Sequence, residues 1–240
     1  ALTSATITSR TPYWQNTDTY RQLLADVEAA DSSLFYRVEK DTRRTKNDGA
    51  WVGYDSASLF SSTTHAGISA IYRDLGLEGN TNAYSFTGAT PFTSSLLGVK
   101  YLLTTEELPE SSLYQLQSAS DGVYLYENLY TLPLGFTIPS DTEDLWTYAT
   151  GNPAQVQNSL AQAAAGAGEV LERVEGGASG ANYQLTVQET AHLFAYIESS
   201  RVTEVPATIG SITQTYENVN RGYLLDLGVC EAGETIVLKA

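Results

Sequence analysis

The chain has 240 residues and a formal net charge of −15 at pH 7. This acidic balance excludes proteins that bind nucleic acid non-specifically through a basic surface, so we expect no nucleic-acid partner. Cys230 is the single cysteine, which excludes a disulfide framework and a cysteine-based metal site. The sequence contains no methionine, even at position 1, which predicts that the chain is a piece of a longer protein.

The first third of the chain alternates helical and strand patterns. A helix is predicted to begin at Asn16–Asp18, because apolar residues then recur at helical spacing through Val27. A short strand follows at Leu34–Glu39. After a long polar loop, a second helix is predicted to begin at Thr63 or Thr64 and to end at Gly76.

The next stretch is predicted to form one short helix and then strands. Pro91 suits the first position of a helix that ends at Gly98. Three strands are then expected at residues 99–103, 122–127 and 134–138. Helices that alternate with strands and are followed by successive strands predict a small α/β sheet with covering helices.

Beyond residue 150 the pattern changes to strands and turns. Asn152 and Pro153 predict the start of one more helix, which Gly166 ends. The remaining expected strands are short and regularly spaced: residues 181–188, 192–198, 203–209, 212–216, 222–227 and 234–239. This spacing is typical of an antiparallel β-sandwich. We therefore predict an α+β protein with an α/β module at 1–150 and a β-sandwich at 151–240.

The loop after the first strand has the strongest functional signal. Five of the 13 Lys and Arg residues fall between Arg37 and Lys46 in an otherwise acidic chain. Aromatic and hydroxyl side chains follow them, and a loop of this length in a compact domain is usually functional when it is ordered. The candidate binding residues are Arg43, Arg44, Lys46, Asn47, Asp48, Trp51, Tyr54, Ser58, Phe60, Ser61 and Ser62.

Two interpretations of this loop stay open. Its arginines could bind phosphate bidentately, with Trp51, Tyr54 and Phe60 stacked on a sugar or a lipid headgroup. Alternatively, its charges pair locally with neighbouring aspartates and its aromatic rings pack to hold the loop.

Other chemistry is not favoured by the sequence. His65 and His192 are the only histidines, and neither lies near a second metal ligand at suitable spacing, so we expect no metal site and no cofactor. His65 could act as a base for Ser61 or Ser62, but the chain has no Gly-x-Ser-x-Gly nucleophile motif, which favours a solvated histidine. Several carboxylate pairs occur, and a solvated surface explains them best.

Several segments resemble the YfhO family of bacterial membrane proteins. The matching residues are FYRVEK at 35–40, ND at 47–48, GY at 53–54, Ser58, FSS at 60–62, TP at 90–91, SLLGVKYL at 95–102, YEN at 126–128 and LPLGF at 132–136. The resemblance covers about residues 30–140 well, and the β-rich remainder fits in outline.

The resemblance implies an extracytoplasmic domain of a multi-pass membrane protein related to GT-C glycosyltransferases. Members are implicated in sugar transfer from a polyprenyl-phosphate donor to teichoic acids at the outer face of Gram-positive membranes. The implied partners are the membrane-embedded remainder of the same chain and a polyprenyl-phosphate sugar or cell-envelope glycan. In such enzymes the catalytic carboxylate usually lies in a loop between membrane helices, so we expect no catalytic residue here. The loop from Arg43 to Ser62 would then face the active site on the membrane side.

An alternative function is a non-catalytic module that binds cell-wall glycan or supports the membrane part. Its stacking surface would come from the aromatic side chains of the predicted sandwich: Tyr183, Phe194, Tyr196, Tyr216 and Tyr223.

Overall fold

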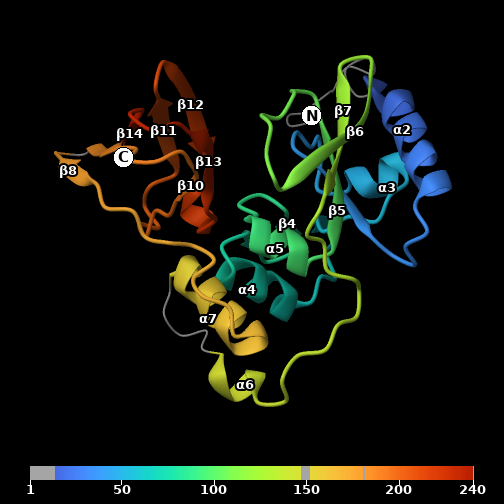
Figure 1. Ribbon diagram of the computed structural model, residues 1–240, viewed down its shortest axis with the longest axis horizontal. Coiled ribbons are helices and arrows are strands. Elements are labelled where there is room, and N and C mark those ends of the chain that lie inside the picture. The colour runs from blue at the N-terminus through green and yellow to red at the C-terminus, as the bar shows by residue number, and fades with distance from the viewer. Residues whose placement is uncertain (1–13, 147–151, 181, 240) are drawn as a thin grey trace, which may run out of the picture. The chain divides into compact units, whose positions relative to one another are not determined.

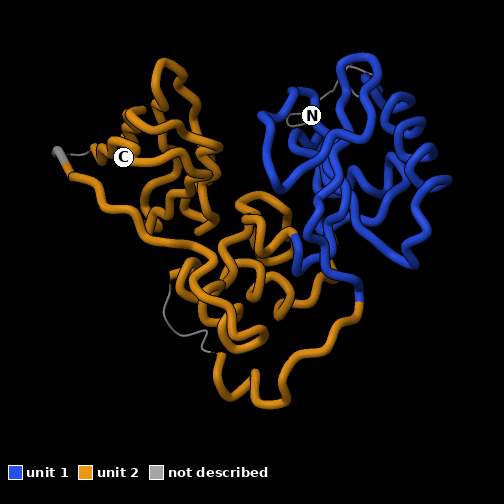
Figure 2. Tube along the Cα trace, in the orientation of Figure 1, with its two compact units in different colours: residues 1–58, 95–134 blue, residues 59–94, 135–240 orange. Residues whose placement is uncertain are grey.

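A computed structural model describes residues 14–146, 152–180 and 182–239 (Figure 1). The chain forms two compact units, each built from two separate stretches (Figure 2). Unit 1 comprises residues 1–58 and 95–134, and unit 2 comprises residues 59–94 and 135–240. Helix α5 (Pro91–Leu96) contains one of the points at which the chain passes between them. The predicted boundary near residue 150 falls outside the described residues and stays a prediction.

Unit 1 is organised around a four-stranded mixed sheet in the order β1-β5-β7-β6. Its strands are β1 (Arg37–Lys40), β5 (Val99–Thr104), β6 (Tyr114–Ser120) and β7 (Val123–Asn128). β1 is parallel to β5, whereas β7 is antiparallel to both β5 and β6. The start of β1 and the end of β7 therefore lie at one end of the sheet, and the end of β1 lies at the other.

Two helices complete unit 1. α2 (Thr17–Ala30) buries Tyr20, Leu23 and Val27, which confirms the helix predicted from their spacing. These side chains pack in one cluster with core residues of β1, β5 and β7, among them Val38 and Leu103. The short helix α3 (Asp48–Val52) adds Val52 to the same core.

The hairpin of β6 and β7 was only half predicted. β6 is rich in serine and glutamine and has no buried residue. It therefore lacks the apolar face by which a strand is recognised in a sequence. Its position is set by the Asp121-Gly122 turn, in which both residues have positive φ (48° and 74°). Asp-Gly is a favoured pair for a two-residue hairpin turn, and this signal identifies β6 as the partner of β7.

Two strand predictions in unit 1 need correction. The strand expected at Leu34–Glu39 is displaced toward the C-terminus, and Leu34 is fully exposed before β1 begins. The strand expected at 134–138, where the chain passes into unit 2, does not form. Those residues are exposed, and Pro133 and Pro139 flank them, neither of which can donate a backbone hydrogen bond to a ladder.

The first part of unit 2 combines a small sheet with helices. The sheet has the order β2-β4-β3, and its strands are β2 (Leu59–Phe60), β3 (Glu78–Asn80) and β4 (Ala83–Ser85). The helices are α4 (Ala66–Asp74), α6 (Thr142–Leu145) and α7 (Pro153–Ala165). β3 and β4 were not predicted, because each is too short to give a period-2 pattern in the sequence.

The helices α7 and α4 fit their predictions to different degrees. Asn152 caps α7 by accepting a hydrogen bond from the Ala154 N–H, and Gly166 ends the helix in the left-handed region, as predicted. α4 begins at Ala66, two or three residues later than expected. Within this helix Ile68 and Ile71 lie at the surface, whereas Tyr72 is buried.

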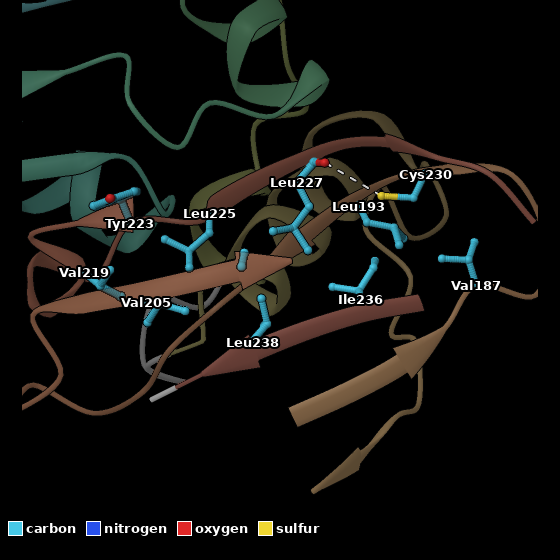
Figure 3. Packing of buried hydrophobic residues seen from close by; sticks show 11 residues of the cluster. Val187, Leu193, Val205, Val219, Tyr223, Leu225, Leu227, Cys230, Ile236 and Leu238 are labelled. Carbon is cyan, nitrogen blue, oxygen red and sulfur yellow. Dashed lines mark hydrogen bonds between the residues drawn. The ribbon is translucent and has the colours of Figure 1, made fainter. Parts of the chain in front are cut away.

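The rest of unit 2 consists of two antiparallel sheets that share one hydrophobic core. One sheet has the order β12-β11-β14-β9-β8 and the other pairs β10 with β13. Their strands are β8 (Gly177–Ser179), β9 (Asn182–Thr186), β10 (Ala191–Ala195), β11 (Glu204–Ile209), β12 (Ile212–Glu217), β13 (Leu225–Cys230) and β14 (Thr235–Lys239). Figure 3 shows that Val205, Leu225, Ile236 and Leu238 point into this core. The α+β class, with antiparallel C-terminal sheets, is therefore confirmed.

Polar contacts connect the sandwich with the first part of unit 2. The 3₁₀ helix η1 (Val219–Arg221) ends in Arg221, whose guanidinium forms an ion pair with Glu78 on β3. The Leu224 N–H donates to the Gly76 carbonyl at 2.8 Å. The side chain of Gln157 on α7 is fully buried between the Thr90 hydroxyl and the Leu75 carbonyl. Unit 2 is thus one packed body built from distant parts of the sequence.

Gly79 provides a test of the packing between α4 and β3. A Cβ atom at Gly79 would lie 2.3 Å from the Ser69 carbonyl oxygen, so the backbone must shift to accept it. We expect Gly79→Ala to lower the free energy of unfolding by about 2 kcal/mol or more in denaturant titrations. Gly177→Ala on β8 is the matched control, because a Cβ there meets nothing within 4 Å. Equal stability of the two variants would contradict this packing.

Candidate functional site

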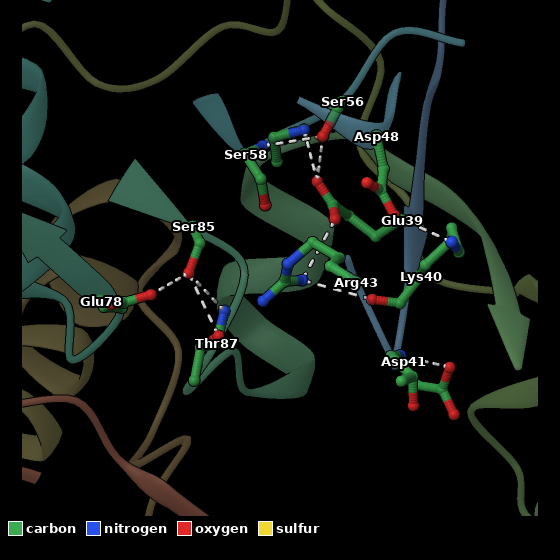
Figure 4. Close-up of polar contacts among 12 residues, drawn as sticks. Glu39, Lys40, Asp41, Arg43, Asp48, Ser56, Ser58, Glu78, Ser85 and Thr87 are labelled. Atoms are coloured by element: carbon green, nitrogen blue, oxygen red, sulfur yellow. Dashed lines mark hydrogen bonds and ion pairs between the residues drawn. The ribbon is translucent and has the colours of Figure 1, made fainter. Parts of the chain in front are cut away.

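The basic loop begins where β1 ends and is held by two buried carboxylates (Figure 4). The first belongs to Glu39, which is completely buried. Its Oε1 accepts hydrogen bonds from the Ser56 hydroxyl at 2.6 Å and the Ala57 N–H at 2.7 Å. Its Oε2 lies 3.3 Å from the Arg43 guanidinium. Glu39 therefore joins the start of the loop to its end.

The second carboxylate belongs to Asp48 and organises the middle of the loop. It accepts hydrogen bonds from the backbone N–H groups of Arg44 and Thr45 at 3.0 and 2.9 Å. It also forms a 2.9 Å ion pair with Lys40, whose side chain is 3% exposed. The Lys40 ammonium lies 4.4 Å from the centre of the Tyr20 ring on α2. Asp48 thus fixes the loop to the sheet and to the core helix.

The pKa of Asp48 reflects this environment. Burial alone would raise the pKa of the carboxyl group, because a charge is costly in a low-dielectric interior. The hydrogen bonds from Lys40 and from the Arg44 and Thr45 amides outweigh that effect, so the pKa lies below its ordinary value. The folded state therefore favours the ionised form of Asp48.

The predicted basic residues differ in how far their charges reach solvent. Arg43 is half-buried and donates to both Glu39 and the Lys40 carbonyl. Arg44 is exposed, and its guanidinium also donates to the Gln15 carbonyl. Lys46 is partly exposed. Local pairing of these charges is therefore present. The carboxylate partners are Asp48, one of the neighbouring aspartates, and Glu39, which was not expected.

Two aromatic residues of the loop, Trp51 and Tyr54, pack within unit 1. Trp51 on α3 packs against Trp14 with ring centres 4.4 Å apart, and Arg21 donates to its carbonyl oxygen. The hydroxyl oxygen of Tyr54 is buried and has no hydrogen-bond partner among the residues that the structure describes. Burial, together with the charges of Glu39 and Asp48, raises the pKa of Tyr54. These rings brace the loop.

The remaining predicted residues have varied positions. The Asn47 N–H donates to the Thr45 hydroxyl, and Ser58 is buried in unit 1. Phe60, Ser61 and Ser62 belong to unit 2: Phe60 is half-exposed on β2, and the Ser61 N–H donates to the Asn82 carbonyl. The structure thus groups Arg43, Arg44, Lys46, Asn47, Asp48, Trp51, Tyr54 and Ser58 within one unit.

Both histidines have local partners. His65 Nδ1 accepts a hydrogen bond from the Gly67 N–H and so caps α4. His192 lies within β10, with its Nε2 2.6 Å from the Asp226 carboxylate. In the described part of the chain, no three His, Cys, Asp or Glu side chains are grouped so that they could hold a metal ion.

Sequence reasoning missed the role of Glu39. It was placed on the predicted strand, but the strand pattern alone did not identify Arg43 as its partner. The available signal was its spacing, since Glu39 at the end of β1 and Arg43 in the loop that follows stand four residues apart.

The geometry defines a mixed α+β domain with a loop fixed by buried charges. The model of the family "Bacterial membrane protein YfhO" matches residues 1–225, so the chain belongs to the YfhO family. The match extends beyond residues 30–140, for which the sequence resemblance was clearest, into the sandwich. No curated protein and no solved structure shows significant similarity to the chain.

The family is one of membrane proteins. Within residues 14–146, 152–180 and 182–239, no helix combines the length and the apolar character needed to cross a bilayer.

Asp48→Ala tests the charge network. The substitution leaves Lys40 buried without its carboxylate and frees two backbone N–H groups. We expect the free energy of unfolding to fall by about 3–5 kcal/mol, measured by denaturant titration. Asp26→Ala on the exposed face of α2 should change it by less than about 0.5 kcal/mol. A loss at Asp48 as small as that at Asp26 would contradict the network.

The lowered pKa of Asp48 also predicts a pH dependence. A carboxyl group with a lowered pKa in the folded state stabilises the protein above its unfolded pKa of about 3.9, and this contribution is lost as the pH falls through the folded value. The difference in unfolding free energy between the wild type and Asp48→Asn should therefore be full at pH 6 and smaller at pH 2.5. A difference that stays constant over this range would show that Asp48 ionisation is not linked to folding.

Proposed function

We propose that this chain is an extracytoplasmic domain of a multi-pass membrane protein of glycosyltransferase type. In this role it assists the transfer of a sugar from a polyprenyl-phosphate donor to a cell-envelope polymer such as teichoic acid. Membership of the YfhO family supports the membrane context. The catalytic carboxylate would belong to the membrane-embedded remainder of the same chain, and this domain would bind a substrate of the reaction.

The ordered basic loop is the observation that carries this proposal. In a chain of net charge −15, a polyanionic substrate is repelled by most of the surface, so its contact needs a local group of cations. Asp48 and Glu39 hold the loop backbone in place, which reduces the entropy that is lost when a ligand binds.

The ligand contacts are divided unequally between the basic residues. Arg43 holds Glu39 and is a positioning residue, because its loss would release the loop. Arg44 is exposed, and a guanidinium has five N–H donors, so it can contact a phosphate while it donates to Gln15. Lys46 adds a second charge two residues further on. These two side chains would contact a phosphate of the donor or of the acceptor.

The test is Arg44→Gln combined with Lys46→Gln in the full-length membrane protein. We expect sugar transfer to the acceptor in isolated membranes to fall at least tenfold at unchanged protein abundance, because two charged phosphate contacts are lost. Arg173→Gln combined with Arg201→Gln removes the same charge from exposed positions in unit 2 and should leave transfer unchanged. Unchanged transfer by the loop variant would overturn this role.

A second candidate function is glycan binding by the sandwich, and one cluster favours it. Phe194 and His192 project from β10 with their rings stacked 4.7 Å apart, and the Asp226 carboxylate lies beside them. An aromatic face next to a carboxylate suits a sugar, which presents both C–H and O–H groups. Tyr223, by contrast, is buried in the core. Binding of peptidoglycan or teichoic acid fragments to the 240-residue chain, abolished by Phe194→Ala, would favour this function.

A further inference from the structure

One end of the unit 1 sheet exposes large apolar side chains. We call this set the apolar rim. It consists of Leu34 (103% exposed), Leu129 (50%), Tyr130 (61%), Leu132 (37%) and Leu134 (64%). Single exposed leucines are ordinary on protein surfaces, whereas five large apolar residues at one end of a sheet indicate an interaction surface.

The topology of the sheet brings the rim together from two distant parts of the chain. Leu34 precedes β1, and Leu129 directly follows β7. Because β1 is parallel and β7 is antiparallel to β5, both positions lie at the same end of the sheet. Figure 1 shows the chain leaving the end of β7 as an extended segment. The basic loop follows the opposite end of β1.

Hydrogen bonds fix the backbone of the rim residues that follow β7. The Leu129 N–H donates to the Leu113 carbonyl at 3.0 Å, and the Leu132 N–H donates to the Ser95 carbonyl at 3.2 Å. Between them, the Tyr130 N–H donates to the Asn128 side chain at 3.0 Å. The rim side chains are therefore presented by a fixed backbone.

The charge pattern around the rim is equally distinctive. Residues 128–140 contain no Asp, Glu, Lys or Arg, although the chain carries 28 acidic residues. Carboxylates border this segment at Glu127, which lies 3.7 Å from the Lys100 ammonium, and at Asp141. The exposed Phe136 and Ile138 continue the apolar character along the chain. An uncharged segment in an acidic chain is compatible with a neutral surface and offers no cationic group of its own to an anionic one.

We propose that the apolar rim inserts into the interfacial region of a lipid bilayer, at zwitterionic rather than anionic headgroups. The chain belongs to a family of membrane proteins, and leucine with tyrosine or phenylalanine is the composition that enters the headgroup and acyl boundary. The charge pattern selects the neutral lipid. This assignment does not depend on the proposed role in sugar transfer.

The proposal also orients unit 1. β5 has six residues, so the sheet end that carries the basic loop lies about 20 Å from the rim. With the rim in the bilayer, Arg44 and Lys46 would contact an acceptor polymer that extends away from the membrane rather than the phosphate of the lipid donor.

The test is flotation of the 240-residue chain with phosphatidylcholine vesicles. The rim variant is Leu129→Ser combined with Leu134→Ser, and the control is Leu116→Ser combined with Ile212→Ser, which are exposed on β6 and β12. We expect the wild type and the control to bind the vesicles within twofold of each other. The rim variant should bind at least tenfold more weakly, since each leucine loses its transfer from water to the apolar region. Phosphatidylglycerol in the vesicles should weaken binding.

Several results would overturn the proposal. One is failure of the wild type to float with phosphatidylcholine vesicles. Another is binding that rises with phosphatidylglycerol and is lost at high salt, which would indicate a basic surface instead. Self-association in sedimentation velocity that the rim variant abolishes, without vesicle binding, would identify a second copy of the chain as the occupant. Since sugar transfer is not measured here, failure of this proposal is distinguishable from failure of the proposed function.

Discussion

The structure of unit 1 depends on two carboxylates that are buried at the end of β1. Glu39 and Asp48 are each taken out of water, which is costly unless every charge is matched by donors. Here the donors are supplied by Lys40, Arg43 and the backbone of the loop itself. The loop therefore has one well-determined conformation. Without these carboxylates the N–H groups of Arg44, Thr45 and Ala57 would lose these hydrogen-bond partners.

This constraint decides what the basic loop can do. The charges nearest the sheet are used to hold the conformation, and those further along the loop can meet a ligand. The two ends of the sheet differ in charge and polarity. One end carries an ordered cationic loop, and the other carries the apolar rim. A domain with an ordered cationic loop at one end and an apolar rim at the other fits a protein of a membrane family.

Much of the fold follows from local sequence patterns. The helices α2 and α7 were predicted from apolar spacing and caps, and the antiparallel strands from alternation and turn residues. The position of β1 was not, because its pairing with the distant strand β5 decided it, and β6 was not, because it has no buried face. The assembly of each compact unit from two stretches also depends on long-range contacts, such as the pairing of Glu78 with Arg221.

The candidate site was located by composition, whereas its internal order was not predictable. A cluster of five basic residues in an acidic chain marks the loop. That Arg43 contacts Glu39 could not be derived, since alternation along a strand does not reveal which outward position another loop will cover. The apolar rim was also missed, because residues 134–138 were predicted to form a strand, whereas the structure shows them exposed and outside any strand.

The most direct test of the central claim is amide hydrogen exchange of the wild-type chain, resolved by NMR at the N–H groups of Arg44, Thr45 and Ala57. These groups donate to the two buried carboxylates. The account predicts that all three exchange far more slowly than in an unstructured peptide, although they belong to no helix or strand. Exchange of these amides at the rates of an unstructured peptide would contradict it.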